Sequence, residues 1–207
     1  SYSVHEITIA YLKENIEKAF ELSKAKCEAQ TRYLRIKGKQ IRDYEKIMSY
    51  IMFNNPAKKI NLKKLPRQTY KQSELWKYGI SGDLPLILVK IKDSNDTYVV
   101  KQVLKAYEFM RTKGFETELV IVDEEKYSYE NYVKEDVEEA ILNSQMAYLK
   151  NVRGGIFALN KNEISKEDMN LLQFVASIII DSKKGGLSNS IKDIEDEYSE
   201  EYRQVEN

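Results

Sequence analysis

Apolar side chains over residues 7–53 recur at intervals of three, four and seven, which places them on one face of a helix. Gly38 interrupts this pattern: either one long helix tolerates the glycine at a cost of about 1 kcal/mol, or two helices meet there. Pro56 ends the pattern, because proline disfavours helix in the residue before it. The positions on this face are Leu12, Ile16, Phe20, Cys27, Leu34, Ile41, Tyr44, Met48 and Ile51.

From Leu84 onward the pattern changes to short apolar runs that alternate with amphipathic stretches. Three runs are predicted as strands: 84–91, 119–122 and 155–159. Three stretches are predicted as helices: 97–113, 129–144 and about 165–181. A β-α-β-α-β-α order with short connections implies a parallel sheet with right-handed crossovers. The predicted fold class is therefore α/β, with a long N-terminal helix or two helices packed on a small parallel sheet.

Turn and capping residues refine the boundaries of these elements. Ser165 is expected to cap the last helix, with Asp168 three residues on, and Gly185-Gly186 to end it. The resulting organisation has four parts: a helical segment at 1–55, a basic connector at 56–74, an α/β domain at 75–187, and an acidic tail or helix at 188–207.

Charge is balanced overall but unevenly distributed. Lys plus Arg and Asp plus Glu both number 33, yet residues 1–72 hold 16 basic and 7 acidic side chains, and residues 187–207 hold 2 and 7. The two ends either attract each other or are separately solvated, and the second interpretation is favoured because exposed charge pairs contribute only about 0–1 kcal/mol.

Residues 56–71 of the connector are rich in lysine and include no acidic residue. The connector is interpreted either as a polyanion contact or as a solvated linker. The linker is favoured, since only Tyr70 supplies a nearby aromatic ring, and no nucleic acid is expected as a partner. The basic residues are Lys58, Lys59, Lys63, Lys64, Arg67 and Lys71.

Most catalytic constellations are excluded by composition. His5 is the single histidine, so neither a histidine-based metal site nor a Ser-His or Cys-His pair can be assembled. Cys27 is alone, which excludes an internal disulfide and favours a reducing compartment. Glycine-rich nucleotide motifs are missing. We therefore expect no catalytic residue, no metal and no cofactor in this chain.

The apolar run 175–180, interrupted by Ser177, falls far short of the roughly 20 residues that a membrane span needs. Neither a membrane span nor a signal peptide is predicted. The expected location is the cytoplasm, or the cytoplasmic face of a membrane-bound parent protein. The chain starts with Ser1 rather than Met, and we expect it to be a piece of a longer protein.

Polar residues follow the predicted strands at their carboxyl ends, where ligands of parallel sheets bind. Asp93, Asp123 and Asn160 occupy these positions. The acidic run 123–125 could bind a cation or sugar hydroxyls, but turn and capping roles are favoured there. Arg153, before the third strand, is interpreted first as part of a turn.

The segment 72–91 joins the helical part to the α/β part and holds the only tryptophan. Trp76 and Tyr78 stand beside a turn-forming cluster that includes Ser81 and Asp83. Two flat aromatic side chains next to a polar, glycine-shaped loop indicate either a sugar-binding surface or packing at the junction. The structural role is favoured, and Trp76, Tyr78, Ser81 and Asp83 remain the candidate substrate-binding residues.

The sequence LWKYGISGDLPLILVKI at Leu75–Ile91 resembles large bacterial proteins of glycoside hydrolase family 94, formerly glycosyltransferase family 36. The resemblance is strongest to cyclic β-1,2-glucan synthases and 1,2-β-oligoglucan phosphorylases. It continues through Ala106–Phe109, Glu118–Val122 and Arg153–Phe157, and covers most of residues 20–187. Tyr107 departs from the pattern, because many relatives have histidine there.

In that family the phosphorolytic site belongs to an (α/α) barrel with an acidic general acid. No such barrel fits in 207 residues. The resemblance therefore implies a non-catalytic accessory fragment of a β-glucan phosphorylase or glycosyltransferase, with the rest of the parent polypeptide as its partner. It also implies a carbohydrate contact, in which Trp76 and Tyr78 stack on β-glucan rings while Ser81 and Asp83 bond hydroxyls. The alternative is a free-standing protein-interaction module that uses its oppositely charged ends.

Overall fold

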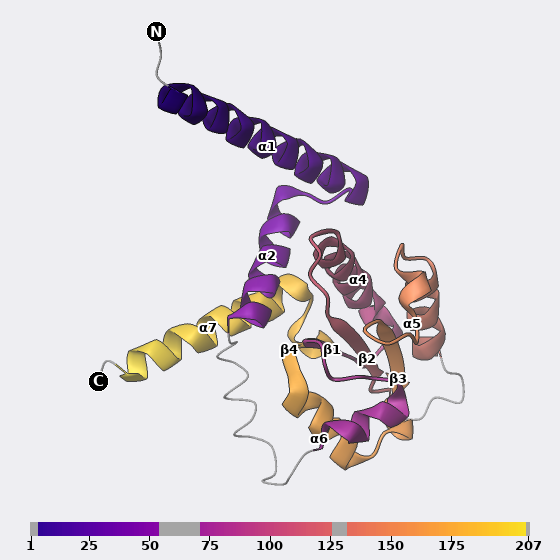
Figure 1. Ribbon diagram of the computed structural model, residues 1–207. Helices are drawn as coiled ribbons and strands as arrows, with labels where there is room; N and C mark the ends of the chain where they lie inside the picture. Colours follow the sequence, from indigo (N-terminus) through magenta and orange to yellow (C-terminus); the bar gives the residue numbers. More distant parts are fainter. Residues whose placement is uncertain (1–3, 54–70, 126–131, 206–207) are drawn as a thin grey trace. The chain divides into compact units, whose positions relative to one another are not determined.

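The computed structural model describes residues 4–53, 71–125 and 132–205, and its chain divides into two compact units, Ser1–Ile41 and Arg42–Asn207 (Figure 1). The basic side chains at 58–67, and residues 129–131 of a predicted helix, lie outside the described residues. None of the described helices combines the length and the apolar character that crossing a membrane requires.

The first unit is built on the helix α1 (Val4–Leu34), and α2 (Gly38–Met52) begins at its end. Arg35 adopts a left-handed backbone conformation with φ of 52°, which ends α1. The side chain of Gln40 then accepts a hydrogen bond from the Lys37 N–H at 2.8 Å. Of the two alternatives for this region, two helices rather than one is therefore correct, and the break falls just before Gly38.

The second unit contains a four-stranded, entirely parallel sheet in the order β3-β2-β1-β4. Its strands are β1 (Leu86–Ile91), β2 (Glu118–Asp123), β3 (Ile156–Asn160) and β4 (Ala176–Asp181). The α/β class and the parallel sheet are confirmed, with one strand more than the sequence predicted.

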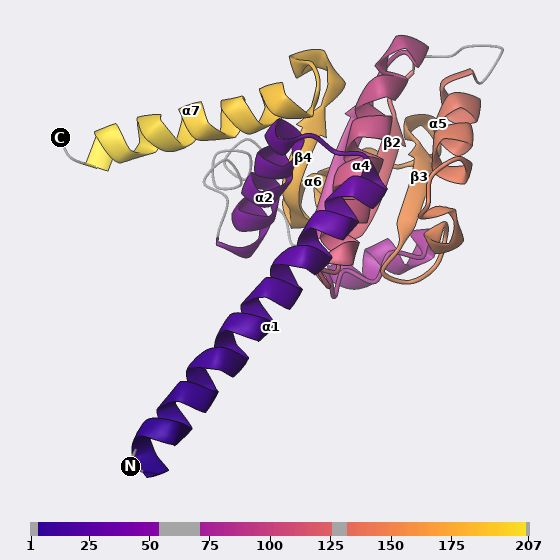
Figure 2. The same ribbon diagram turned by 90° about the horizontal axis from the view of Figure 1, so that it is seen from above.

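Helices cover both faces of this sheet (Figures 1 and 2). On one face lie α4 (Thr97–Thr112) and α5 (Tyr132–Leu142), with α7 (Leu187–Val205) in contact with both α4 and β4. On the opposite face lie α6 (Lys166–Val175) and the 3₁₀ helix η1 (Gln72–Tyr78), which contact each other. The acidic C-terminal segment is thus a helix rather than a tail.

Alternate strand residues supply the two layers of the core, as the period of two requires. Leu88, Val120 and Phe157 face α6 and η1, where they pack with Leu75 and Leu172. On the other face, the part of α2 from Arg42 onward adds aromatic packing. The ring of Tyr44 lies 5.6 Å from that of Phe109 in α4, centroid to centroid.

The predicted helix 165–181 is wrong beyond Val175. Ser165 does cap α6, accepting a hydrogen bond from the Asp168 N–H at 3.0 Å, but α6 ends at Val175. The following residue already begins β4, which pairs in parallel with β1. The helical spacing of Leu171, Leu172, Val175 and Ile178 continued across this boundary because no glycine or proline separates the helix from the strand. Gly185 accordingly ends only the short 3₁₀ helix η5 (Ser182–Lys184), and Gly186 precedes α7.

Residues 178–180 test this assignment by mutation. Ile178 and Ile180 are both buried on the face of α4 and α7, so replacing either with alanine lowers the free energy of unfolding by about 2–5 kcal/mol. Ile179→Ala, at a partly buried position on the opposite face, costs less. Urea denaturation measures all three. In a continuous helix residues 178 and 180 would lie about 200° apart, so a large effect at only one of them would contradict the strand.

Candidate functional site

The loop that follows η1 has a backbone that only glycine adopts readily. Gly79 ends η1 with φ of 78°, and a Cβ atom there would lie 3.2 Å from the Phe157 ring. Gly82 has φ of 69°, and a Cβ atom there would lie 2.8 Å from the side chain of Gln72. The glycines of this turn cluster are therefore needed for its shape.

The carboxylate of Glu118 holds this loop at the start of β2. It is fully buried and accepts hydrogen bonds from the backbone N–H groups of Ser81 at 2.9 Å and Gly82 at 3.0 Å. It also accepts from the N–H of Gly154 at 3.3 Å. One carboxylate thus joins the turn before β1 to the turn before β3.

Tyr107 and Arg111 of α4 brace the second of these turns. The Tyr107 hydroxyl donates to the Gly154 carbonyl at 3.3 Å, and Arg111 donates to the Tyr107 hydroxyl at 2.8 Å and to the Gly154 carbonyl. Burial raises the pKa of the Tyr107 hydroxyl, although Arg111 acts in the opposite direction. Tyr107, the departure from the family pattern, thus serves the fold here as a hydrogen-bonding side chain.

Trp76 stands at the surface of this assembly. Its side chain is 64% exposed, and its indole N–H donates to the Ser81 carbonyl at 3.3 Å, which fixes the orientation of the ring. The indole borders a hollow of about 320 Å³. The residues that line this hollow are Trp76, Gly79, Ile80, Ser81, Asp83 and Arg153.

An exposed ion pair continues the surface. The Arg153 guanidinium lies 2.6 Å from the Asp83 carboxylate. Both residues also line a second hollow of about 320 Å³ together with Ser81, so the pair is common to the two hollows. The second hollow is completed by Leu84, Arg111, Glu116, Leu149 and Gly154.

Of the four candidate residues, the structure brings together Trp76, Ser81 and Asp83. Tyr78 does not line either hollow: its hydroxyl donates to the Asp168 carboxylate at 2.9 Å, and its ring packs against the core. Arg153 lies in a turn, as the sequence favoured, and its side chain also joins this surface. Its pairing with Asp83, seventy residues away, leaves no local signal in the sequence.

At the carboxyl ends of the strands, polar side chains form hydrogen bonds with one another and with the nearby backbone. The Asp123 carboxylate accepts from the Asn160 side chain at 3.0 Å and from the Glu125 N–H at 2.8 Å. Asp93 accepts from the Asn95 N–H at 2.8 Å. These contacts match the turn and capping roles that the sequence favoured. Among the described side chains, no three His, Cys, Asp or Glu residues are grouped as a metal site requires.

Glu124 is the centre of this network. Its buried carboxylate lies 3.5 Å from Lys90, 3.2 Å from Lys161 and 3.3 Å from Lys183. Burial opposes its ionisation, but the three ammonium groups outweigh burial and lower its pKa. Lys90 is itself mostly buried and also lies 3.3 Å from Asp181 of β4.

Comparison with known proteins gives one informative similarity. No protein-family model matches the chain. The chain is 24% identical over 165 residues to the cyclic beta-(1,2)-glucan synthase NdvB of Rhizobium meliloti (strain 1021), a match that covers 79% of this chain. The chain spans only 6% of the length of that relative. The similarity indicates a distant relationship to a glucan synthase, while membership of glycoside hydrolase family 94 stays a prediction.

Glu118→Ala tests the anchoring of the two turns. We expect it to lower the free energy of unfolding by about 3–5 kcal/mol, because three backbone N–H groups lose their acceptor and each unsatisfied group costs about 1–3 kcal/mol. Glu116→Ala is the control: that carboxylate is exposed and pairs with Arg111, so its loss costs less than about 1 kcal/mol. Equal effects in thermal or urea unfolding would contradict the anchor.

Glu124→Gln tests the charge network and its pH dependence. Removing one partner of a buried ion pair costs about 3–5 kcal/mol, and we expect about 2–3 kcal/mol here because Lys90 keeps Asp181. Since the pKa of Glu124 is lowered, its contribution is complete above pH 4.5, the ordinary glutamate value, and is lost as the pH falls through the folded-state pKa. The unfolding free energies of the unaltered protein and of Glu124→Gln should therefore converge as the solution becomes acidic. A difference between them that stays constant with pH would contradict this assignment.

Proposed function

We propose that this chain is a non-catalytic accessory region of a glucan-handling protein and that it contributes a carbohydrate-contacting surface around Trp76. The observation that carries the proposal is an exposed indole held in a fixed orientation beside a hollow lined by Ser81, Asp83 and Arg153. The similarity to a cyclic beta-(1,2)-glucan synthase supports the choice of glucan as the ligand.

The geometry suits a sugar in two respects. An indole presents a flat apolar face that can pack against the C–H face of a pyranose ring, and its N–H is already bonded to Ser81, so the ring is ordered before a ligand arrives. Asp83 and Arg153 offer charged acceptors and donors that hydroxyl groups can bond.

The two hollows suit a linear oligosaccharide better than a single sugar. Each has a volume of about 320 Å³, at the small end of the range for ligand sites, and both include the Asp83–Arg153 pair. In our proposal one sugar ring occupies the hollow beside Trp76 and a neighbouring ring the other, with the ion pair bonding hydroxyls of both. Catalysis belongs, in this proposal, to another part of the parent polypeptide.

Trp76 itself provides the test, because it is the single tryptophan and its fluorescence reports on this surface alone. Titration with β-1,2-linked gluco-oligosaccharides should shift its emission saturably. In calorimetry, Trp76→Ala should remove the binding heat, and Asp83→Asn should weaken binding about tenfold, the effect of losing roughly 1.4 kcal/mol. Tyr132→Ala, which removes an exposed aromatic ring on α5 outside both hollows, is the matched control.

Failure of this titration would remove the carbohydrate contact. Absence of binding heat for both the unaltered protein and Trp76→Ala, with unchanged fluorescence, is that outcome. The accessory role is tested separately by the flanking gene sequence: a catalytic barrel encoded in the same reading frame supports it, and a reading frame that encodes nothing further contradicts it.

A protein-interaction module is the second candidate, and one observation favours it. Within α1, large apolar side chains at helical spacing are exposed, including Leu12, Ile16 and Phe20. An apolar stripe of this kind is typical of a helix that packs against another protein surface. This candidate requires a protein partner and places no demand on Trp76.

A further inference from the structure

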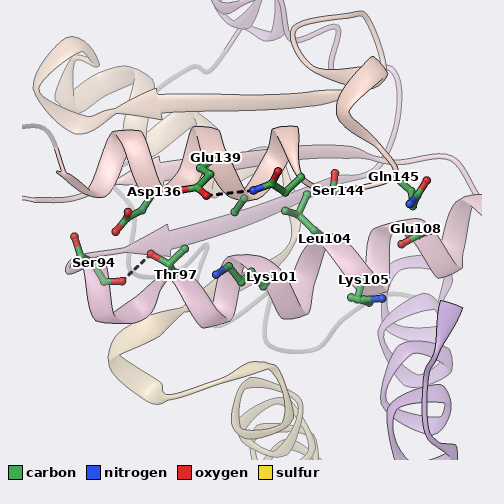
Figure 3. A pocket seen from close by; sticks show the side chains of 12 residues that line it. Ser94, Thr97, Lys101, Leu104, Lys105, Glu108, Asp136, Glu139, Ser144 and Gln145 are labelled. Atoms are coloured by element: carbon green, nitrogen blue, oxygen red, sulfur yellow. Dashed lines mark hydrogen bonds between the residues drawn. The ribbon is translucent and has the colours of Figure 1, made fainter.

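A groove of about 500 Å³ lies between α4 and α5, on the opposite face of the sheet from η1 and α6 (Figure 3). Its volume falls within the range of small-molecule sites. The lining is polar except for Leu104 and Ala140. The residues are Ser94, Thr97, Lys101, Leu104, Lys105, Glu108, Asp136, Glu139, Ala140, Asn143, Ser144 and Gln145.

Glu108 is the unusual member of this lining. Its side chain is only 5% exposed, and within the described part of the chain its carboxylate has neither a hydrogen bond nor an ion pair. Burial raises its pKa, with the charge of Lys105 acting in the opposite direction. Buried carboxylates are almost always paired, because burying an isolated charge is costly. Among the described residues, Lys105 thus attracts this carboxylate at longer range, but no hydrogen bond satisfies it.

The neighbours of Glu108 explain why it lies in the groove. Tyr107, Phe109 and Met110 are buried in the core, so the helix turns Glu108 toward α5. Lys101 and Leu104 precede it by seven and four residues and lie on the same side of α4. Glu108 belongs to the segment Ala106–Phe109, which contributes to the family resemblance but was given no chemical role from the sequence.

Further carboxylates border the groove from the other helix. Asp136 and Glu139 project from α5 toward α4, as Figure 3 shows. Glu139 accepts a hydrogen bond from the Asn143 side chain at 3.3 Å. Asp136 and Lys101 form no ion pair with each other or with any other described residue. The charges of Lys101 on α4 and Asp136 on α5 are thus opposite in sign, but no ion pair between them bridges the groove.

We propose that this groove binds a small aliphatic amine, whose ammonium group ion-pairs with Glu108. An ammonium group supplies the positive charge and the hydrogen-bond donors that this buried carboxylate lacks. Leu104 and Ala140 provide an apolar contact for the carbon chain of the ligand.

Binding depends on pH in a defined direction. The charge on Glu108 must be present, and its pKa lies above 4.5, the ordinary glutamate value, whereas an aliphatic ammonium stays charged to about pH 10. Affinity therefore rises as the pH increases from 4.5 through the pKa of Glu108. Lys101, Lys105, Asp136 and Glu139 are the other charged groups on the groove.

The experiment is a titration of the full chain with putrescine, butylamine and the neutral analogue butanol, followed through backbone amide resonances. Both amines should shift resonances of α4 and α5 saturably, and butanol should not. Glu108→Gln should weaken amine binding about tenfold or more. Glu167→Gln, at an exposed carboxylate of α6 on the other face, should leave it unchanged.

Stability supplies an independent measurement on the same variants. Because the folded-state pKa of Glu108 is raised, the unaltered protein loses stability relative to Glu108→Gln as the pH rises above 4.5. The melting temperature of the unaltered protein should therefore fall relative to that of Glu108→Gln between about pH 4 and pH 8. Amine shifts that survive Glu108→Gln, equal shifts with butanol, or a difference in melting temperature that does not change with pH would each overturn the proposal.

Discussion

The hydrogen bonds to the Glu118 carboxylate are the interaction on which the rest of the second unit depends. They tie the loop at Ser81 and Gly82 and the turn at Gly154 to the first residue of β2. The starts of strands β1, β2 and β3 are therefore all held by this carboxylate. The backbone of Glu118 adds to this, because its N–H donates to the Pro85 carbonyl at 2.9 Å. A charged acceptor satisfies these buried N–H groups more strongly than a neutral one.

The same anchor places the surface residues. Trp76 is oriented by the Ser81 carbonyl, and Ser81 is held by Glu118 through its N–H. Asp83 follows in the same loop, and Arg153 precedes the glycine that Glu118 also binds. The two sides of the hollows come from segments seventy residues apart, so their geometry depends on one buried carboxylate rather than on the surface ion pair, which contributes little.

The sequence predicted correctly those elements that can be identified from the residue types within the element itself. The strands β1 and β2 were found because the apolar runs 86–89 and 119–122 fill most of their length, and Ser165 because its hydroxyl caps α6 directly. The strand β4 was missed since its isoleucines also fit a helical period, and only pairing with β1 decides between the two. Its run of β-branched residues at 178–180 was the available signal. The side-chain partners of Tyr78 and Arg153 left no local signal for a related reason, because Asp168 and Asp83 are distant in the sequence.

Glu118 and Glu108 show why burial alone does not separate structural from binding carboxylates. Both are buried in the same unit. Glu118 is fully used by backbone donors, so it stabilises the fold and has little capacity left for a ligand. Glu108 lies at the wall of a groove without a described partner, so the fold gains nothing from its charge. A charge that the fold does not use, at a position with access to solvent space, is better explained by a ligand than by packing.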